Sequence, residues 1–186
     1  ILLNTSSKSV TSFFFFFFNR TRVSSIVLHN GKIIVGLLNN LYSLIAEGTG
    51  YKTQLLHPQY LFPEIKELFS YKGALWVGTL THGCFIINEP VEQINNIAPF
   101  KIQTDGVGCF ITDANDKLWI GTRGNGIVQY DEKTGTVQTA THDRYDGRSP
   151  GKNFVLSLFK DKQGTIWCGI SGSRVAKYDP LKYQFY

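Results

Sequence analysis

The sequence contains no methionine and only three cysteines among its 186 residues. The absence of methionine even at position 1 predicts a processed or internal piece of a longer product. Cys84, Cys109 and Cys168 have spacings that match no zinc or redox motif, and each lies in an apolar stretch. We therefore predict that the three cysteines are buried and serve as small apolar side chains. If one bridge formed in an oxidising compartment, Cys84 with Cys109 would be the favoured pair.

The sequence also has no large excess of one charge, because it contains 19 basic and 14 acidic residues. Lys8, Arg20 and Arg22 supply much of the excess, and the remainder of the chain is nearly balanced. Nucleic-acid binding needs clustered Lys and Arg, so the sequence argues against a nucleic-acid partner. A hydrophobic content of 42% and an aromatic content of 14% predict a packed domain.

Long hydrophobic runs are missing too, and the longest is Phe13–Phe18. Six residues cannot cross a bilayer, which takes a helix of about 20 apolar residues. Two interpretations stay open for residues 1–22. The run is either a doubly buried strand of an element that precedes residue 23 or the remnant of an export signal.

The chain does contain internal repeats. Three segments, from Ile65, Cys109 and Val155, each show an apolar alternating run, a polar turn, Trp-x-Gly, a second turn and a second run. A weaker copy starts at Val23, where Ile34 replaces the tryptophan. The repeat anchors are Trp76, Gly78, Trp119, Gly121, Tyr130, Trp167, Gly169 and Tyr178.

This period, about 40–45 residues with four short strands, is typical of a β-propeller blade. We predict an all-β fold of four-stranded antiparallel blades near 23–57, 65–103, 108–141 and 154–186. Each tryptophan should fill the wedge between neighbouring sheets, and the glycine two residues later should let the next sheet approach. In the third copy the strands are expected near 108–113, 117–122, 126–131 and 136–141. An arc of four blades leaves a sheet face uncovered, so a fragment of a longer ring is favoured over a closed four-bladed ring.

The segments "DKLWIGTRGNGIVQYDEKTG" and "VLSLFKDKQGTIWCGISGSRVAKYDPLKYQF" resemble the two-component regulator propeller repeat, clearly over 65–186 and weakly over 23–57. That repeat builds the extracytoplasmic sensor of bacterial hybrid histidine kinases. The resemblance implies part of a seven-bladed periplasmic propeller that binds an oligosaccharide. It also implies partners in the remaining blades and kinase domains of the parent chain, and a homodimeric receptor. It implies no cofactor and no catalysis by this portion itself.

The loop 141–152, "THDRYDGRSPGK", contains the insertion that lengthens the last repeat spacing. Arginine offers forked donors, tyrosine can stack on a sugar ring, and long loops on rigid scaffolds often carry function. In a propeller this connection shares a face with the turns between the second and third strands. The alternative is a plain solvated loop. The candidate ligand-binding residues are His82, Arg123, Asn125, His142, Arg144, Tyr145 and Arg148.

Other motifs are interpreted as structural. "GTRGNG" at 121–126 lacks the residues of a phosphate loop and joins strand to strand, so it predicts a hairpin turn. "DANDK" at 113–117 lacks the later ligands of a calcium loop and predicts an ordinary turn. We assign no catalytic and no metal-binding residue. A propeller enzyme acting on polysaccharide, as a lyase or glycosidase, and a protein-binding structural propeller remain the alternative functions.

Overall fold

The computed structural model describes residues 22–48, 50–93, 97–100, 102, 104–172, 174–179 and 184–185. These residues form four sheets of four strands each, and no helix occurs among them. The Phe13–Phe18 run lies outside the described residues, so both interpretations of it stay open. The strands of the first two sheets are β1 (Val23–His29), β2 (Lys32–Leu37), β3 (Asn40–Glu47), β4 (Gly50–Leu56), β5 (Ile65–Tyr71), β6 (Ala74–Thr79), β7 (Cys84–Ile87) and β8 (Ile97–Phe100). Those of the third and fourth are β9 (Val107–Thr112), β10 (Leu118–Thr122), β11 (Ile127–Asp131), β12 (Thr136–Ala140), β13 (Val155–Lys160), β14 (Ile166–Ile170), β15 (Arg174–Asp179) and β16 (Gln184–Phe185).

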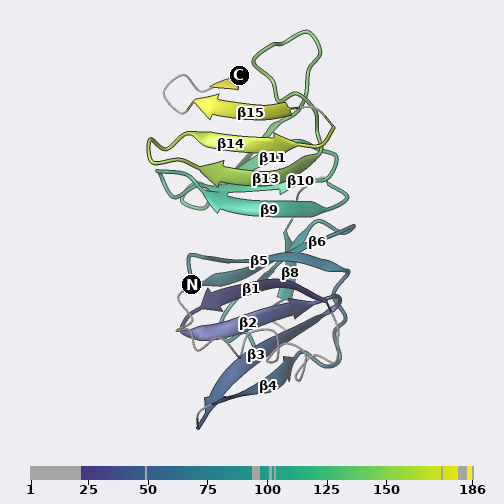
Figure 1. Cartoon of the computed structure of the whole chain (residues 1–186), viewed down its shortest axis with the longest axis vertical. Helices are drawn as coiled ribbons and strands as arrows, with labels where there is room; N and C mark the ends of the chain where they lie inside the picture. Colours follow the sequence, from purple (N-terminus) through teal and green to yellow (C-terminus); the bar gives the residue numbers. More distant parts are fainter. Residues whose placement is uncertain are drawn as a thin grey trace, which may run out of the picture.

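Each sheet is an antiparallel meander in which strands pair in chain order. The sheets stack one upon the next along the long axis of the molecule (Figure 1). The first strand of every sheet contacts the first strand of its neighbour, so β1, β5, β9 and β13 form a common inner edge. The fold is therefore a partial β-propeller, and the predicted all-β blade architecture is confirmed. The strands expected in the third repeat lie within one residue of β9 to β12.

Local sequence explains how each sheet begins. The first two sheets join their first two strands by Asn30-Gly31 and Lys72-Gly73, in which both residues have positive φ (45° and 78°, 47° and 79°). Such two-residue turns match the twist of a hairpin and favour Asn and Gly. In every sheet a bulge interrupts the first strand close to the repeat glycine, which follows Ile34 in the first sheet and a tryptophan in the others. A bulge bends a strand and redirects its side chains.

That glycine lets the next sheet approach, as predicted. A Cβ added to Gly121 would lie 2.8 Å from Cγ1 of Val155 on the fourth sheet. The corresponding distance from Gly78 to Val107 Cγ1 is 3.0 Å. Real Cβ atoms are almost never this close to another atom, so a larger residue would push the sheets apart.

The tryptophans fill the wedges between sheets where a following sheet exists. Trp76 is 2% exposed and Trp119 is 3% exposed. The Trp119 ring lies 4.7 Å from that of Tyr178 on the fourth sheet, in a tilted arrangement. Trp167 departs from the prediction: it is 37% exposed because no described sheet covers the far side of the fourth sheet.

The cysteines are buried and free, which agrees with the prediction of small hydrophobes. Burial raises the pKa of the Cys84 and Cys168 thiols to about 12, so neither is a reactive thiolate. The Cys84–Cys109 pair suggested for an oxidising compartment does not form. Cys109 instead packs with Cys168 in the core between the third and fourth sheets.

Candidate ligand-binding face

One end of the sheets gathers two kinds of connection. Middle turns join the second and third strands of a sheet, and crossover connections join one sheet to the next. Backbone hydrogen bonds link the two kinds: Arg123 N–H donates to Gly106 O at 2.9 Å, and Gly124 N–H donates to Asn153 O at 3.1 Å. Ser171 N–H likewise donates to Phe154 O at 2.9 Å. We call this surface the connection face, comprising the described residues of 38–39, 57–64, 80–83, 102–106, 123–126, 141–154 and 171–172.

A buried threonine shapes two of the middle turns. The Thr79 hydroxyl donates to Gly83 O at 2.9 Å, and the Thr122 hydroxyl donates to Gly126 O at 2.7 Å. Both side chains are 0% exposed. The turns are therefore held rigidly, and they present their outer residues to solvent in a fixed position.

The sequence-predicted residues of these turns lie on the connection face. The Arg123 guanidinium stacks over the Phe154 ring at 4.6 Å, an arrangement typical of a cation–π contact. Asn125 donates its backbone N–H to the Thr122 hydroxyl at 3.0 Å. His82 is exposed one middle turn away, with Nδ1 2.8 Å from the Thr81 hydroxyl.

The loop 141–153 is folded by its own hydrogen bonds. His142 Nδ1 donates to Pro150 O at 2.8 Å, and the Asp143 backbone N–H donates to the Ser149 hydroxyl at 2.9 Å. Asn153 ties the loop to the neighbouring turn, because its side-chain oxygen accepts the His142 N–H while its carbonyl accepts from Gly124. The loop protrudes beyond the sheets at the end of the molecule that carries the C-terminus (Figure 1).

Two predicted ligand residues stand at the outside of this loop. Tyr145 is 86% exposed, and the Arg144 guanidinium lies 5.0 Å from its ring centroid. An exposed aromatic face next to forked donors is suited to a flat or sugar-like ligand. His142 and Arg144 also line a small hollow of about 330 Å³ within the loop.

A larger cleft of about 540 Å³ lies between the third and fourth sheets beside this loop. Aromatic rings of Trp119, Tyr178 and Phe185 contribute its apolar wall, and the loop residue Arg148 lies at its rim. Arg148 Nε donates to Asp146 Oδ1 at 3.0 Å, and this pairing lowers the pKa of Asp146. Apolar walls with a few placed polar groups characterise ligand pockets.

The polar wall of this cleft was missed at the sequence level. Gln129 on β11 and Gln138 on β12 line it, and the two residues are direct cross-strand partners. A signal existed, since each glutamine interrupts a short strand, "IVQYD" and "TVQTA". Only the register of the two strands places both side chains on the same face of the sheet, where the Gln129 amide also donates to Asp113 Oδ2 at 3.4 Å.

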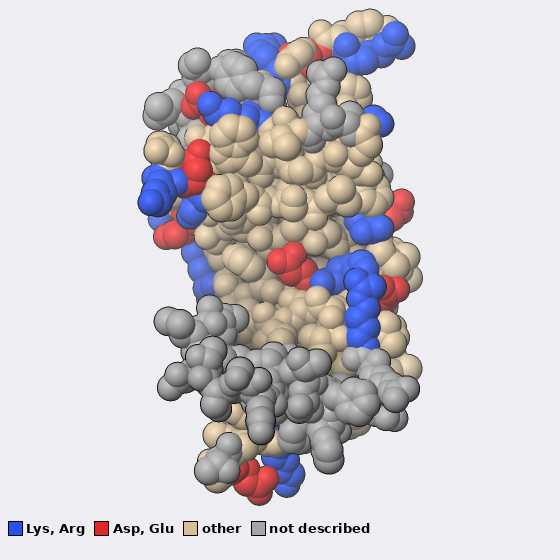
Figure 2. Space-filling view, viewed as in Figure 1, with Lys and Arg blue, Asp and Glu red and all other residues tan. Residues whose placement is uncertain are grey.

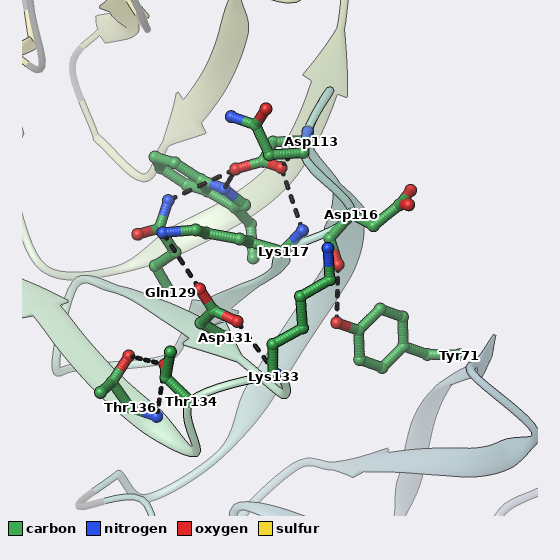
Figure 3. Close-up of polar contacts among 11 residues, drawn as sticks. Tyr71, Asp113, Asp116, Lys117, Gln129, Asp131, Lys133, Thr134 and Thr136 are labelled. Atoms are coloured by element: carbon green, nitrogen blue, oxygen red, sulfur yellow. Dashed lines mark hydrogen bonds and ion pairs between the residues drawn. The ribbon is translucent and has the colours of Figure 1, made fainter.

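In the segment "DANDK", the carboxylate of Asp113 has a structural role, because it accepts hydrogen bonds from the turn and from Trp119 (Figure 3). Asp113 Oδ1 accepts the backbone N–H groups of Asn115 and Lys117, at 2.8 and 3.0 Å. Its Oδ2 accepts the indole N–H of Trp119 at 3.0 Å. Asp161 makes the equivalent bond to Trp167 at 2.8 Å. The described residues contain no group of three or more His, Cys, Asp or Glu that could hold a metal ion.

Two further titratable groups, the partly buried Glu67 and the buried His29, lie between sheets rather than at the cleft or loop. Burial raises the pKa of Glu67 on β5 to about 7, although the Phe110 backbone N–H donates to its carboxyl. Burial also lowers the pKa of His29, whose Nδ1 lies 2.8 Å from the Ser70 hydroxyl. These groups belong to the packing of neighbouring sheets.

Solved structures share this fold. The extracellular domain of BT4673 from B. thetaiotaomicron, assigned to a hybrid two-component system, aligns over 83% of the chain with a TM-score of 0.67 and 21% identity. The corresponding domain of BT3049 aligns over 89%, with a TM-score of 0.67 and 15% identity. Virginiamycin B lyase from Staphylococcus aureus aligns over 89%, with a TM-score of 0.64 and 16% identity. At these identities the likeness establishes the propeller fold.

The alignment spans only 21% and 24% of the two sensor domains, and 55% of the lyase. No protein-family model matches the chain, and no curated protein matches it. The described segments include no membrane-spanning helix. On the face drawn in Figure 2, the described charges occur in small groups of both signs and form no continuous basic area.

Proposed function

We propose that this chain is the ligand-sensing propeller portion of an extracytoplasmic, periplasmic receptor of the hybrid two-component class. It would bind an oligosaccharide and pass the signal to kinase domains elsewhere in the parent polypeptide. The fold shared with the BT4673 and BT3049 extracellular domains supports the receptor class. The resemblance of residues 65–186 to the two-component regulator propeller repeat supports it independently.

The observation that supports ligand binding is that an ordered loop lies beside a cleft. The 141–153 loop is held by internal hydrogen bonds, so little conformational entropy is lost when a ligand binds. Rings of Tyr145 and Tyr178 can pack on the apolar faces of sugars. Arg148 and the amides of Gln129 and Gln138, which line the cleft, can hydrogen-bond hydroxyl groups.

The remaining partners follow from this role. The other blades and the kinase domains of the same polypeptide would complete the receptor, which would act as a homodimer. The sensor itself would carry no catalysis and no cofactor. The residues that face the ligand would be those of the loop, with Arg123, Asn125 and His82 extending the surface across the middle turns.

Binding can be measured by titration calorimetry of the chain against a panel of neutral and acidic oligosaccharides. Tyr145→Ala and Arg144→Ala should each weaken binding about tenfold, which corresponds to about 1.4 kcal/mol. The matched control is Lys133→Ala, which removes an exposed cation from the turn between β11 and β12, outside the connection face. If the parent chain binds an oligosaccharide and both loop variants bind it with the same heats, the assignment of the ligand site to this loop is wrong.

A lyase is the second candidate, because virginiamycin B lyase shares the fold. The same oligosaccharide panel can be incubated with the chain and the products separated by mass. If the chain converts an oligosaccharide and the Tyr145→Ala and Arg144→Ala variants convert it equally fast, the chain is an enzyme whose active site lies outside the loop. Binding without turnover favours the sensor.

A further inference from the structure

The cleft between the third and fourth sheets exists because one residue of the third sheet is small. Across the third strand from the repeat glycine, the fourth strand carries Leu56 in the first sheet, Phe100 in the second and Ala140 in the third. The Phe100 ring centroid lies 4.8 Å from that of Trp76 and 5.0 Å from that of Tyr130 on the next sheet. Phe100 therefore fills its wedge. Ala140 has only a methyl group at this position, and it lines the cleft.

The wall of this cleft is also polar where the equivalent wall is apolar. The positions of Gln129 and Gln138 are occupied in the second sheet by Ile86 and Ala98. Ile86 packs there against the core that contains Trp76. Of the three wedges between described sheets, only the third combines a small fourth-strand residue with two amide side chains. An unfilled wedge costs stability, so its retention here indicates a ligand site.

The Gln129 amide has a fixed orientation. A carboxylate only accepts hydrogen bonds, so it is the amide nitrogen that donates to Asp113 Oδ2, at 3.4 Å. The amide oxygen points away from Asp113 (Figure 3) and can accept from a ligand hydroxyl. Asp113 is itself held by the turn amides and the Trp119 indole. This acceptor is therefore preorganised, which lowers the entropic cost of binding.

The charges that line the cleft cancel each other. Its two charged residues are Arg148 and Asp146, and the arginine donates to both carboxylate oxygens, from Nε at 3.0 Å and from Nη2 at 3.4 Å. The other polar side chains of the lining are uncharged amides and hydroxyls: Gln129, Gln138, Thr139, Thr141 and Ser149. Amides and hydroxyls both donate and accept, as sugar hydroxyls do. A bound carboxylate or sulfate would lose its hydration without gaining an unpaired cation, and Asp146 would repel it.

We propose that the cleft between the third and fourth sheets selects a neutral oligosaccharide over one that carries carboxyl or sulfate groups. Gln129 and Gln138 bind the sugar hydroxyls, and Ala140 provides the room that Phe100 occupies in the second sheet. This inference rests on the proposed function, to which it adds the class of ligand and the residues that determine it.

The first test compares neutral and acidic sugars by titration calorimetry of the whole chain. The probes are oligomers of mannan, galactan and glucan beside oligomers of mannuronate, galacturonate and glucuronate, whose pairs differ chiefly in the carboxyl group. The tightest ligand should be neutral and should bind at least about tenfold more tightly than its acidic counterpart. Its Kd should hardly change between low and high salt, because no ion pair forms. An acidic oligomer that binds more tightly than every neutral one would overturn the proposal.

Ala140→Phe tests the cleft itself, because it recreates the filling of the second sheet. It should abolish measurable binding of the neutral oligomer, while the circular dichroism spectrum and melting temperature stay those of a folded chain. The matched control is Val137→Phe on the same strand, an equal change at an exposed residue that does not line the cleft. This variant should bind as the parent does. A folded Ala140→Phe variant with parental affinity would refute the assignment to the cleft.

Two substitutions of the exposed Gln138 decide the matter if Ala140→Phe does not fold. Gln138→Leu keeps the volume but removes the hydrogen bonds, so it should weaken neutral binding about fivefold. Gln138→Lys places a cation in the cleft and should narrow the preference for the neutral member of a pair. Parental affinity and selectivity in both variants would overturn the proposal. If binding is then lost only in Tyr145→Ala and Arg144→Ala, the sensor function stands without this cleft. If no oligosaccharide binds the parent chain, both proposals fail.

Discussion

Trp119 and Trp167 occupy the same place in the third and fourth sheets but differ in surroundings. Each donates its indole N–H to the aspartate six residues earlier, at 3.0 and 2.8 Å. Trp119 is 3% exposed beneath the fourth sheet, whereas Trp167 is 37% exposed. The repeat therefore determines the position and the hydrogen bond of each tryptophan, and the neighbouring sheet determines its burial. Stability should accordingly reside in the contacts between sheets.

The largest contrast is expected when each tryptophan is removed. Trp119→Ala should lower the free energy of unfolding by about 3–5 kcal/mol, because it opens a cavity under the fourth sheet. Trp167→Ala should lower it by only about 1 kcal/mol, since its ring is already partly solvated. Urea unfolding followed by far-ultraviolet circular dichroism measures both. Equal losses would show that burial between sheets does not dominate.

The next contrast concerns Glu67 and Ser157, which hold the same position in the second and fourth sheets. Burial raises the pKa of Glu67 from 4.5 to about 7. The folded chain thus keeps this carboxyl protonated at a pH where the unfolded chain ionises it. The free energy of unfolding should therefore fall as pH rises from about 4.5 to 7, by about 2 kcal/mol after allowance for partial exposure.

Glu67→Gln should remove this pH dependence and leave the variant more stable than the parent at pH 8, because the amide oxygen can still accept the Phe110 N–H. Urea midpoints at pH 5 and pH 8 give the comparison. Ser157→Glu is the matched control: it places a carboxyl at the same position without a covering sheet, and should add no pH dependence over this range. A Glu67→Gln variant that keeps the parental slope would refute the assignment.

The smallest contrast is expected at the two aspartates. Asp113→Asn turns one accepting oxygen into a donor that faces the Trp119 indole or the turn amides. The loss should be about 1 kcal/mol, or about 3 °C in melting temperature. Asp161→Asn should cost less because its partner Trp167 is more exposed. Melting curves of the two variants test the ranking, and a larger drop for Asp161→Asn would contradict it.

Much of the fold could be predicted because its signals are local. Strand alternation, turn residues and the Trp-x-Gly spacing are short-range, and they placed β9 to β12 within one residue. The predicted role of the glycine in Trp-x-Gly is also confirmed at Gly78 and Gly121. Both depend on features that every copy repeats.

The candidate site could be predicted only in part. The insertion pointed to the 141–152 loop, and Arg148 of that loop does line the cleft. The wall formed by Gln129 and Gln138 was not expected, because it depends on the register of β11 against β12. The stacking of Arg123 on Phe154 likewise joins two segments separated by the strands β11 and β12.

The sequence alone determined that four similar four-stranded sheets form and where their strands and turns lie, because strand alternation and turn chemistry act within a few residues. Only the tertiary structure decided that Trp119 is buried and Trp167 is open, that Glu67 lies beneath Phe110, and that Cys109 packs with Cys168. Burial depends on what lies across an interface, and no single repeat contains that information.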